Sequence, residues 1–239
     1  MKVSVAMATY NGENYLKEQI ESIINQLGND DELIISDDGS TDGTVAIIKS
    51  YLEDPRIKFF TNPGNGVIQN FENAIRNTSN DVIFLSDQDD VWLPNKVQFM
   101  LKEFKNPKVN LVISEAKFVN FDLNVTNNTT SYSIQWKKGA VNNFIKNTYI
   151  GCCMAFRKDI KEFILPFPKN IPMHDVWIGI LCEMSKFEIS HLPNQLILYR
   201  RHNNTATNSK RNNFRKILYW RLVLSYNLAK RFIKSRGLN

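Results

Sequence analysis

Short apolar runs alternate with amphipathic segments through the first half of the chain. Largely apolar runs predict strands at residues 3–8, 32–36, 56–60 and 82–85. Between them, apolar residues recur every three or four positions and predict helices over residues 16–27, 44–52 and 71–75. Strands that alternate with helices indicate βαβ units. The expected fold is therefore α/β, with one Rossmann-like, mostly parallel sheet flanked by helices.

The second half of the chain is less regular. We expect strands at residues 110–114, 151–156 and 196–199 and a helix over 176–184. Residues 120–133 are polar and rich in Asn and Thr, which indicates a loop. No internal repeat is visible, and no linker rich in Pro, Gly or Ser separates two domains.

Polar clusters follow three of the predicted strands. They lie at residues 9–12 (TYNG), 37–40 (DDGS) and 87–90 (DQDD). The carboxyl ends of parallel strands meet at one edge of a sheet, and ligands bind beyond that edge. A single cluster such as DDGS is more often a turn with an Asp cap on the next helix. Three clusters at the ends of successive strands indicate a shared site.

The composition is that of a globular protein. The chain has 239 residues, 43% hydrophobic and 23% charged, which excludes a disordered, collagen-like or coiled-coil protein. No apolar run reaches the roughly 18 residues of a membrane-spanning helix. The first residues lack the features of a secretory signal, and the three cysteines fit neither a disulfide framework nor a zinc knuckle. We therefore expect a reducing, cytoplasmic location.

The charge is unevenly distributed along the chain. There are 30 Lys and Arg against 24 Asp and Glu, a net charge of +6. No acidic residue follows Glu188, whereas eleven basic residues do, so residues 1–188 are mildly acidic and the remainder is strongly basic. This asymmetry favours an anionic partner, either membrane phospholipid or nucleic acid. The alternative is a solvated basic helix that increases solubility.

Asp87 and Asp89 are two residues apart, so in an extended segment their carboxylates project to the same side. Such a pair suits Mg²⁺ or Mn²⁺ bound to a diphosphate, whereas Zn²⁺ favours clustered His and Cys. We expect Asp90 to point the other way and to hold the loop. The phosphate loops GxxxxGK[ST] and GxGxxG are absent. A nucleotide bound without such a loop needs a cation on its diphosphate, which indicates a nucleotide-sugar enzyme.

Six segments together resemble the family 2 glycosyltransferases, which have the GT-A fold. In the family's order they are VSVAMATYNGENYL, ELIISDDGSTDGT, VIFLSDQDDVWLPNK, residues 151–157, IPMHDVWIG and LILYRRHNN. The SDQDDVW, HDVW and YRRH forms are most similar to the rhamnosyltransferase-like branch of bacterial surface-polysaccharide enzymes. The resemblance implies a GT-A glycosyltransferase domain over residues 1–205, followed by a basic, aromatic-rich helical tail over residues 206–239.

The resemblance implies a donor site at the first two clusters. Thr9, Tyr10 and Glu13 match the family's nucleotide-contacting loop. Asp38 matches the residue that binds the imide edge of uracil or thymine, and an acceptor-only carboxylate suits the N3–H donor of those bases. The implied donor is a dTDP- or UDP-sugar, and Asp38 accepts either nucleotide.

The resemblance also implies how the diphosphate is bound. Asp87 and Asp89 match the metal-binding DxD motif, so Mn²⁺ or Mg²⁺ is the implied cofactor. Arg200, Arg201 and His202 follow a predicted strand and are candidates for gripping the leaving diphosphate, with His202 completing the metal shell. Strand alternation would turn Arg200 and His202 toward the site and Arg201 away from it.

Asp175 matches the family's acidic position ahead of Trp177 and is the expected catalytic base. It lies between a proline-bearing apolar loop and an apolar helix, where desolvation raises the pKa of a carboxylate. The alternative is that His174 or Asp175 merely caps a helix that begins at Val176. The implied reaction is a single displacement with inversion at the anomeric carbon, in which Asp175 takes the proton of an acceptor hydroxyl.

The acceptor side is expected to include Gly151, Cys152, His174 and Trp177. No basic residue is adjacent to Cys152, which favours a small buried residue over a nucleophile. Trp92 and Trp177 are candidates for stacking on a sugar face, with burial in the core as the alternative.

The tail suits an enzyme whose acceptor is a lipid-linked saccharide. Residues 210–236 combine basic and aromatic residues, but their apolar stretch is too short to span a bilayer. We expect a peripheral helix at the anionic inner face of the bacterial membrane. The alternative is a helix that packs on its own domain or on a second subunit of a homodimer.

Two other classes of protein stay open as alternatives. A metal-dependent nucleotidyltransferase or phosphohydrolase also needs paired carboxylates. A nucleic-acid-binding module acting through the basic tail leaves the acidic clusters unexplained and lacks RNP, helix-turn-helix and zinc patterns. We therefore expect no nucleic-acid partner.

Overall fold

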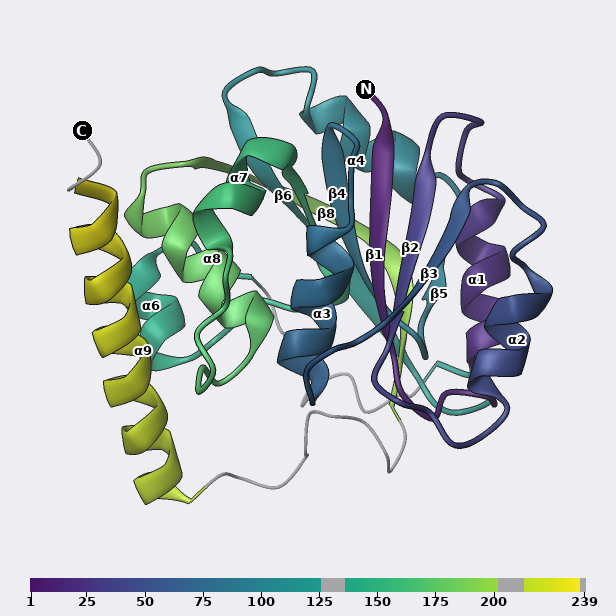
Figure 1. Ribbon diagram of the computed structural model, residues 1–239. Coiled ribbons are helices and arrows are strands. Elements are labelled where there is room, and N and C mark those ends of the chain that lie inside the picture. Colours follow the sequence, from purple (N-terminus) through teal and green to yellow (C-terminus); the bar gives the residue numbers. More distant parts are fainter. Residues whose placement is uncertain (126–135, 202–212, 237–239) are drawn as a thin grey trace.

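Eight strands of the described residues form one mixed sheet in the computed structural model (Figure 1). The structure describes residues 1–125, 136–201 and 213–236. The strands lie in the order β3-β2-β1-β4-β7-β6-β8-β5. They are β1 (Val3–Thr9), β2 (Glu32–Asp37), β3 (Ile57–Thr61), β4 (Val82–Asp87), β5 (Val91–Trp92), β6 (Val109–Val119), β7 (Met154–Arg157) and β8 (Glu188–Arg200).

The parallel part of the sheet brings the three polar clusters together. β1 pairs in parallel with β2 on one side and with β4 on the other. Every residue of β1 and β2 is buried, which explains their largely apolar sequences. Thr9 lies beside Asp37, and Ala8 lies beside Asp87. The expected meeting of the clusters at one sheet edge is therefore confirmed.

The antiparallel strand β7 brings the second half of the chain to the same edge. β7 runs antiparallel to β4, with Ala155 opposite Phe84. Its start therefore lies near the end of β4, together with the preceding 3-10 turn η1 (Gly151–Cys153). β6 is antiparallel to β7 and β8 is parallel to β6. Arg200, the last residue of β8, reaches this edge as well.

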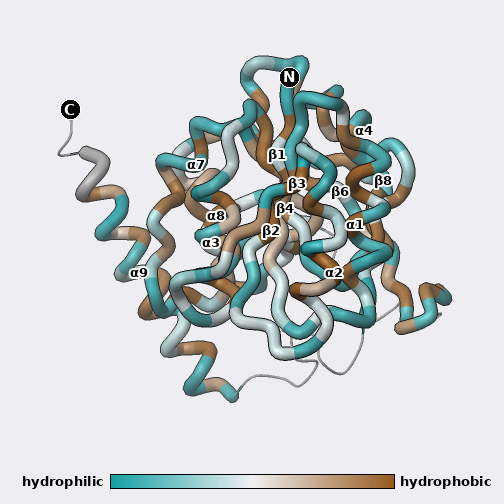
Figure 2. Tube along the Cα trace, turned by 45° about the vertical axis from the view of Figure 1, so that its right-hand side comes forward, coloured by the Kyte–Doolittle hydropathy of each residue, from teal (hydrophilic) through white to brown (hydrophobic). Residues whose placement is uncertain are grey.

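Helices flank the sheet. They are α1 (Leu16–Ile24), α2 (Thr44–Ser50), α3 (Val67–Arg76), α4 (Lys96–Glu103), α6 (Ala140–Ile145), α7 (Lys158–Ile164), α8 (His174–Met184) and α9 (Phe214–Arg236). α3 packs on β1 and β2, and α4 packs on β6 and β8. Phe71, Ala74 and Ile75 are fully buried on α3, as their helical spacing predicted. Figure 2 shows hydrophobic residues concentrated along the central strands.

The sequence underestimated β8 and misassigned the start of β7. β8 spans 13 residues, whereas the apolar pattern marked only 196–199. Residues 193–195 of β8 are exposed and include Pro193, so no apolar run reveals this part of the strand. The predicted strand over 151–156 begins instead as η1, in which the Cys153 N–H donates to the Ile150 carbonyl oxygen at 3.0 Å.

α9 packs on its own domain through one face. It lies along α6 and α8, away from the sheet (Figure 1). Leu224 and Leu228 are buried, and Arg231 donates to the carbonyl oxygens of Phe163 and Leu165 at 2.6 and 2.8 Å. The opposite face exposes Phe214, Leu218, Tyr219, Leu222, Tyr226 and Ile233. Within the described residues, no helix combines the length and the apolar character that crossing a bilayer requires.

Candidate functional site

The edge of the sheet where the clusters meet forms one wall of a cavity of about 1690 Å³. α3, α6 and the start of α8 supply further lining residues, and α9 closes one side. The predicted site residues that line this cavity are Thr9, Tyr10, Asp38, Asp87, Asp89, Gly151, His174, Asp175, Arg200 and Arg201. The first and second halves of the chain thus contribute to a single cavity.

The two carboxylates of the DDGS turn have different roles. Asp37 is buried and accepts the N–H groups of Gly39 and Ser40 at 3.0 and 2.8 Å, so it builds the turn. Asp38 lines the cavity, as expected of the second carboxylate. Its oxygens accept the side-chain amide of Asn62 at 2.6 Å and the N–H of Gly66 at 2.7 Å. These two bonds fix the orientation of Asp38 at the cavity wall.

The first polar loop is tied to the other two clusters. The hydroxyl of Thr9 is buried and donates to Asp37 at 2.9 Å. Tyr10 is 54% exposed and lines the cavity. The side-chain amide of Gln88 accepts the Tyr10 N–H at 2.8 Å and donates to the Tyr10 carbonyl at 2.9 Å. Glu13 accepts the N–H of Gly43 at 2.7 Å and does not belong to the cavity lining. Glu13 therefore joins the first loop to the start of α2.

The acidic loop concentrates negative charge. Burial, and after it the charges of Asp89 and Asp175, raise the pKa of Asp87 to about 8. Burial and the charges of Asp89 and Asp87 also raise the pKa of Asp90 well above its usual value. A cation relieves this repulsion, and hard carboxylate oxygens are the ligands that Mg²⁺ and Mn²⁺ prefer. The residues present therefore fit a divalent cation.

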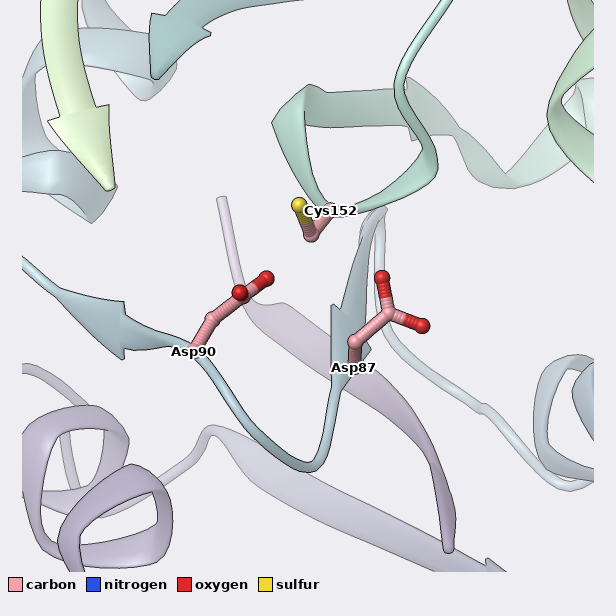
Figure 3. A group of neighbouring side chains, drawn as sticks. All are labelled: Asp87, Asp90 and Cys152. Atoms are coloured by element: carbon pink, nitrogen blue, oxygen red, sulfur yellow. The ribbon is translucent and has the colours of Figure 1, made fainter. Parts of the chain in front are cut away.

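The orientation of Asp90 differs from expectation. Asp87, Asp90 and Cys152 place one carboxylate oxygen or sulfur each within 4.8 Å of one another (Figure 3). The expectation that Asp90 points away from Asp87 is therefore wrong, because the chain turns sharply between β4 and β5. Asp90 also holds the loop, as expected, since its Oδ1 accepts the Arg200 N–H at 3.1 Å.

The guanidinium of Arg200 bonds to other groups of the protein. Its Nε donates to the Asp89 carbonyl oxygen at 2.8 Å, and its Nη2 pairs with Glu18 at 2.6 Å. Arg201 lies over the rings of Phe118 and Tyr199 at 5.7 and 5.0 Å. Both arginines line the cavity, which agrees with naming both as candidates for the diphosphate, and the contact with the diphosphate itself stays a prediction. His202 lies outside the described residues.

Asp175 lies in the first turn of α8, which begins at His174, two residues earlier than the sequence indicated. The carboxylate is 8% exposed and lines the cavity. Burial raises its pKa to about 7, although hydrogen bonds from the backbone N–H groups of Val176 and Gly151 act in the opposite direction. Asp175 thus bonds to the Val176 N–H at 2.6 Å and also faces the cavity.

The residues expected on the acceptor side fall into two groups. Gly151 and His174 line the cavity, and a Cβ on Gly151 would lie 2.6 Å from His174 Nε2. His174 stacks on Phe71 with ring centroids 3.9 Å apart, and burial lowers its pKa to about 3, so the ring is neutral. Cys152 and Trp177 are fully buried and do not line the cavity.

The buried position of Trp177 agrees with the alternative to sugar stacking. Its indole N–H donates to the Ile164 carbonyl oxygen at 3.0 Å. Trp92 is 3% exposed, so it too is a core residue.

Several functional candidates are not visible in the sequence. Gln88 and Glu18 hold the polar loops through hydrogen bonds and an ion pair. The only sequence feature that marks Gln88 is its position between Asp87 and Asp89. On the far side of the cavity, α6 and α9 supply the lining residues Phe144, Lys146, Lys216, Trp220 and Arg221. The positive charges of Lys146, Lys216 and Arg221 face a cavity whose opposite wall is acidic.

A comparison with models of known protein families identifies the family of this chain. Residues 4–164 match the model described as Glycosyl transferase family 2. The chain belongs to glycosyltransferase family 2. The match confirms the expected enzyme class, a glycosyltransferase of the hexosyl-transferring type.

Two relatives of this glycosyltransferase are bacterial. One is the UDP-Glc:alpha-D-GlcNAc-diphosphoundecaprenol beta-1,3-glucosyltransferase WfgD of Escherichia coli, 26% identical over 182 residues, which are 75% of this chain and 69% of the relative. The other is the dTDP-rhamnosyl transferase RfbG of Shigella flexneri, 29% identical over 221 residues, 83% of this chain and 72% of the relative.

Solved structures confirm the GT-A-like fold of this glycosyltransferase. The Staphylococcus aureus TarS 1–349 complex with UDP-GlcNAc has a TM-score of 0.67 at 17% identity and covers 94% of this chain and 66% of its own. The mannosyltransferase PcManGT from Pyrobaculum calidifontis, in complex with GDP-Man and Mn²⁺, has a TM-score of 0.62 at 17% identity and covers 84% and 57%. This chain thus spans two thirds or less of these two structures.

Proposed function

We propose that this glycosyltransferase moves a sugar, rhamnose or another hexose, from a dTDP- or UDP-sugar to a saccharide acceptor with inversion at the anomeric carbon. One observation carries the proposal: Asp38, the acidic loop and Asp175 line the same cavity. A nucleotide site, a cation site and a general base are the three parts that this reaction needs. The names of RfbG and WfgD support both donor nucleotides.

The donor occupies the wall made by the first two clusters. Asp38 accepts the N3–H of the base, and Tyr10 lies at the exposed rim beside it. Thr9 and Glu13 support the two loops from behind through the bonds to Asp37 and Gly43. Arg201 is the cation for the diphosphate, because Arg200 already holds the acidic loop. His202 remains part of the proposed metal shell.

Asp87 and Asp89 hold Mn²⁺ or Mg²⁺. The cation neutralises charge that develops on the departing nucleotide diphosphate. Asp175 accepts the proton of the acceptor hydroxyl as its oxygen attacks the anomeric carbon. A pKa near 7 suits this role, because about half of the carboxylates are ionised at neutral pH and each is a stronger base than an exposed Asp. No covalent intermediate is required.

The acceptor occupies the side of the cavity toward α6 and α9. Gly151 leaves room for it, His174 lines the approach to Asp175, and Cys152 and Trp177 support the wall from the core. Trp220 and the cations Lys146, Lys216 and Arg221 suit an acceptor that carries both a sugar and a phosphate. WfgD acts by name on a diphosphoundecaprenol acceptor, which supports a lipid-linked saccharide of bacterial surface-polysaccharide synthesis such as O-antigen or capsule.

The division of the chain at residues 205 and 206 follows this assignment. Residues 1–205 carry the donor and catalytic groups, and the helix of the tail completes the acceptor side. α9 contains no acidic residue, and the face opposite its packed side exposes six large apolar or aromatic residues. An anionic lipid surface satisfies both features. The enzyme is thus peripheral at the cytoplasmic face of the membrane.

Vesicle binding tests the membrane part of the proposal. The protein should sediment with phosphatidylglycerol vesicles at low salt and not with phosphatidylcholine vesicles. Leu218→Glu with Leu222→Glu should abolish this binding, whereas Leu52→Glu, at an exposed leucine just after α2, should not. A wild type that stays in solution and forms a dimer that the α9 variant disrupts would instead assign the exposed face to a homodimer interface.

Nucleotide binding tests the catalytic part. Purified protein is titrated with UDP and with dTDP in Mn²⁺ or in EDTA. Binding of UDP, of dTDP or of both should require the metal. It should be lost in Asp89→Ala but kept in Asp30→Ala, an exposed acid two residues before β2. Binding of neither nucleotide in any metal condition would refute the proposed function.

A further inference from the structure

Cys152 lies at a position where a buried thiol meets two carboxylates. Its Sγ and one oxygen each of Asp87 and Asp90 lie within 4.8 Å of one another. Figure 3 shows Asp87 at the end of β4 and Asp90 on the following loop, both beneath the turn η1 that carries Cys152. Cys152 is fully buried and Asp90 is 1% exposed. The three groups thus form a compact pocket of one soft and two hard ligands.

Asp90 gives independent evidence for a ligand at this point. Its Oδ1 accepts the Arg200 N–H, whereas its Oδ2 is buried and no N–H or O–H group within residues 1–125, 136–201 and 213–236 donates to it; the weakly donating thiol of Cys152 is the group that faces this carboxylate. A buried carboxylate oxygen that loses water and gains no donor is costly. A cation held between Asp90, Asp87 and Cys152 satisfies this oxygen.

The position of these groups differs from that of a DxD cation. Asp87 and Asp89 line the cavity, whereas Asp90 and Cys152 lie behind its wall. Asp87 is therefore the only residue that the two ligand sets share.

The ligand chemistry selects the cation. Thiolate is a soft ligand that favours Zn²⁺ and similar ions over Mg²⁺ and Mn²⁺. Tetrahedral ligands about 2.0–2.3 Å from one Zn²⁺ ion lie roughly 3.3–3.8 Å from each other. The ligand atoms in the structure lie within 4.8 Å of one another, so the three side chains would close by up to about 1 Å around the ion.

We propose that Asp87, Asp90 and Cys152 bind a thiophilic divalent cation of the Zn²⁺ class, in a site separate from the donor cation. Binding forms a metal–sulfur bond, the thiol proton leaves to solvent, and water completes the coordination. Because Asp87 is withdrawn from the donor cation, occupation of this site inhibits donor binding. This inhibition, unlike the binding itself, rests on the proposed function.

Cobalt spectroscopy of the metal-free protein tests the site directly, without nucleotide. Co²⁺ should produce a thiolate-to-cobalt charge-transfer absorption that saturates at one ion per chain and disappears when Zn²⁺ is added. The absorption should be absent in Cys152→Ser and weaker in Asp90→Asn. It should be unchanged in Cys182→Ser, a buried cysteine of α8 outside the cluster. No absorption in the wild type, or the same absorption in Cys152→Ser, overturns the proposal.

A competition experiment tests the consequence for the enzyme. Zn²⁺ should weaken the Mn²⁺-dependent binding of UDP or dTDP by at least tenfold in the wild type and by much less in Cys152→Ser. Equal inhibition of the two proteins overturns the inhibitory role. If neither nucleotide binds in Mn²⁺ while the cobalt absorption is present, the proposed function fails and the cation site stands.

Discussion

Arg200 donates its Nε–H to the carbonyl oxygen of Asp89 at 2.8 Å, although 111 residues separate them in the chain. The same side chain forms an ion pair with Glu18, and its backbone N–H donates to Asp90. The end of β8 therefore fixes the backbone of the acidic loop and one of its carboxylates. The geometry of the proposed cation site depends on a residue that itself need not touch the cation.

Arg200→Gln should loosen this loop. We expect the Mn²⁺-dependent affinity for UDP or dTDP to fall about tenfold or more, the usual effect of removing a residue that orients metal ligands. Glu18→Gln is the matched control, because it removes only the ion pair with a carboxylate whose side chain is 55% exposed, and its effect should be smaller. Unchanged metal dependence in Arg200→Gln would contradict a bracing role.

Asp38→Asn should weaken the binding of uracil and thymine nucleotides. Asn62 and Gly66 donate to different oxygens of Asp38, so the substitution keeps an acceptor for only one of them and removes the charge that accepts the base N3–H. A hydrogen bond to a charged group contributes about 1.5–3 kcal/mol, so titration calorimetry should record at least a tenfold loss. CDP should lose little, because cytosine has no N3–H to donate. Equal losses for UDP and CDP would show that Asp38 does not read the base.

The pH dependence of the reaction should report Asp175. Burial raises the pKa of this carboxyl to about 7, and only the ionised form accepts a proton. The rate at saturating Mn²⁺ should therefore rise with pH and level off above about 7. Initial rates measured across this range in overlapping buffers provide the test. A rate that is constant from about pH 5 upward would exclude a base with a raised pKa.

Asp175→Asn should stabilise the folded protein at alkaline pH. A carboxyl with a raised folded-state pKa costs stability once it is ionised, fully above about pH 7 and not at all below its unfolded value of 3.8. The shift from 3.8 to about 7 corresponds to roughly 4 kcal/mol. Denaturant unfolding should show the gain of Asp175→Asn at pH 8 and its gradual disappearance toward pH 4. A gain that is independent of pH would attribute the effect to packing.

The meeting of the clusters could be predicted because it depends on local patterns. The apolar runs of β1, β2 and β4 identify buried parallel strands, and polar residues after such strands must meet at one edge. The role of Asp38 was implied by the resemblance. The structure turns Asp38 to the cavity while Asp37 builds the turn, and the contact of Asp38 with the base stays a prediction.

Contacts between distant segments could not be predicted from the sequence. Lys96 reads as a surface residue at the start of a helix, yet it is fully buried and donates to the Cys152 carbonyl oxygen at 2.7 Å. The approach of Cys152 to Asp87 and Asp90 depends on the antiparallel insertion of β7, which no local pattern reveals. Alternation could not decide between Arg200 and Arg201 at the end of β8, and in the structure both line the cavity.

Asp175 is the proposed base of a metal-dependent glycosyl transfer in this cavity. The most direct test compares wild type and Asp175→Asn for binding of the donor nucleotide in Mn²⁺ and for turnover of the nucleotide sugar. We expect Asp175→Asn to bind the nucleotide as tightly as the wild type. Its turnover should fall at least a hundredfold, because a general base usually contributes a factor of about 10²–10⁴ to the rate. Turnover by Asp175→Asn at the wild-type rate would contradict this role of Asp175.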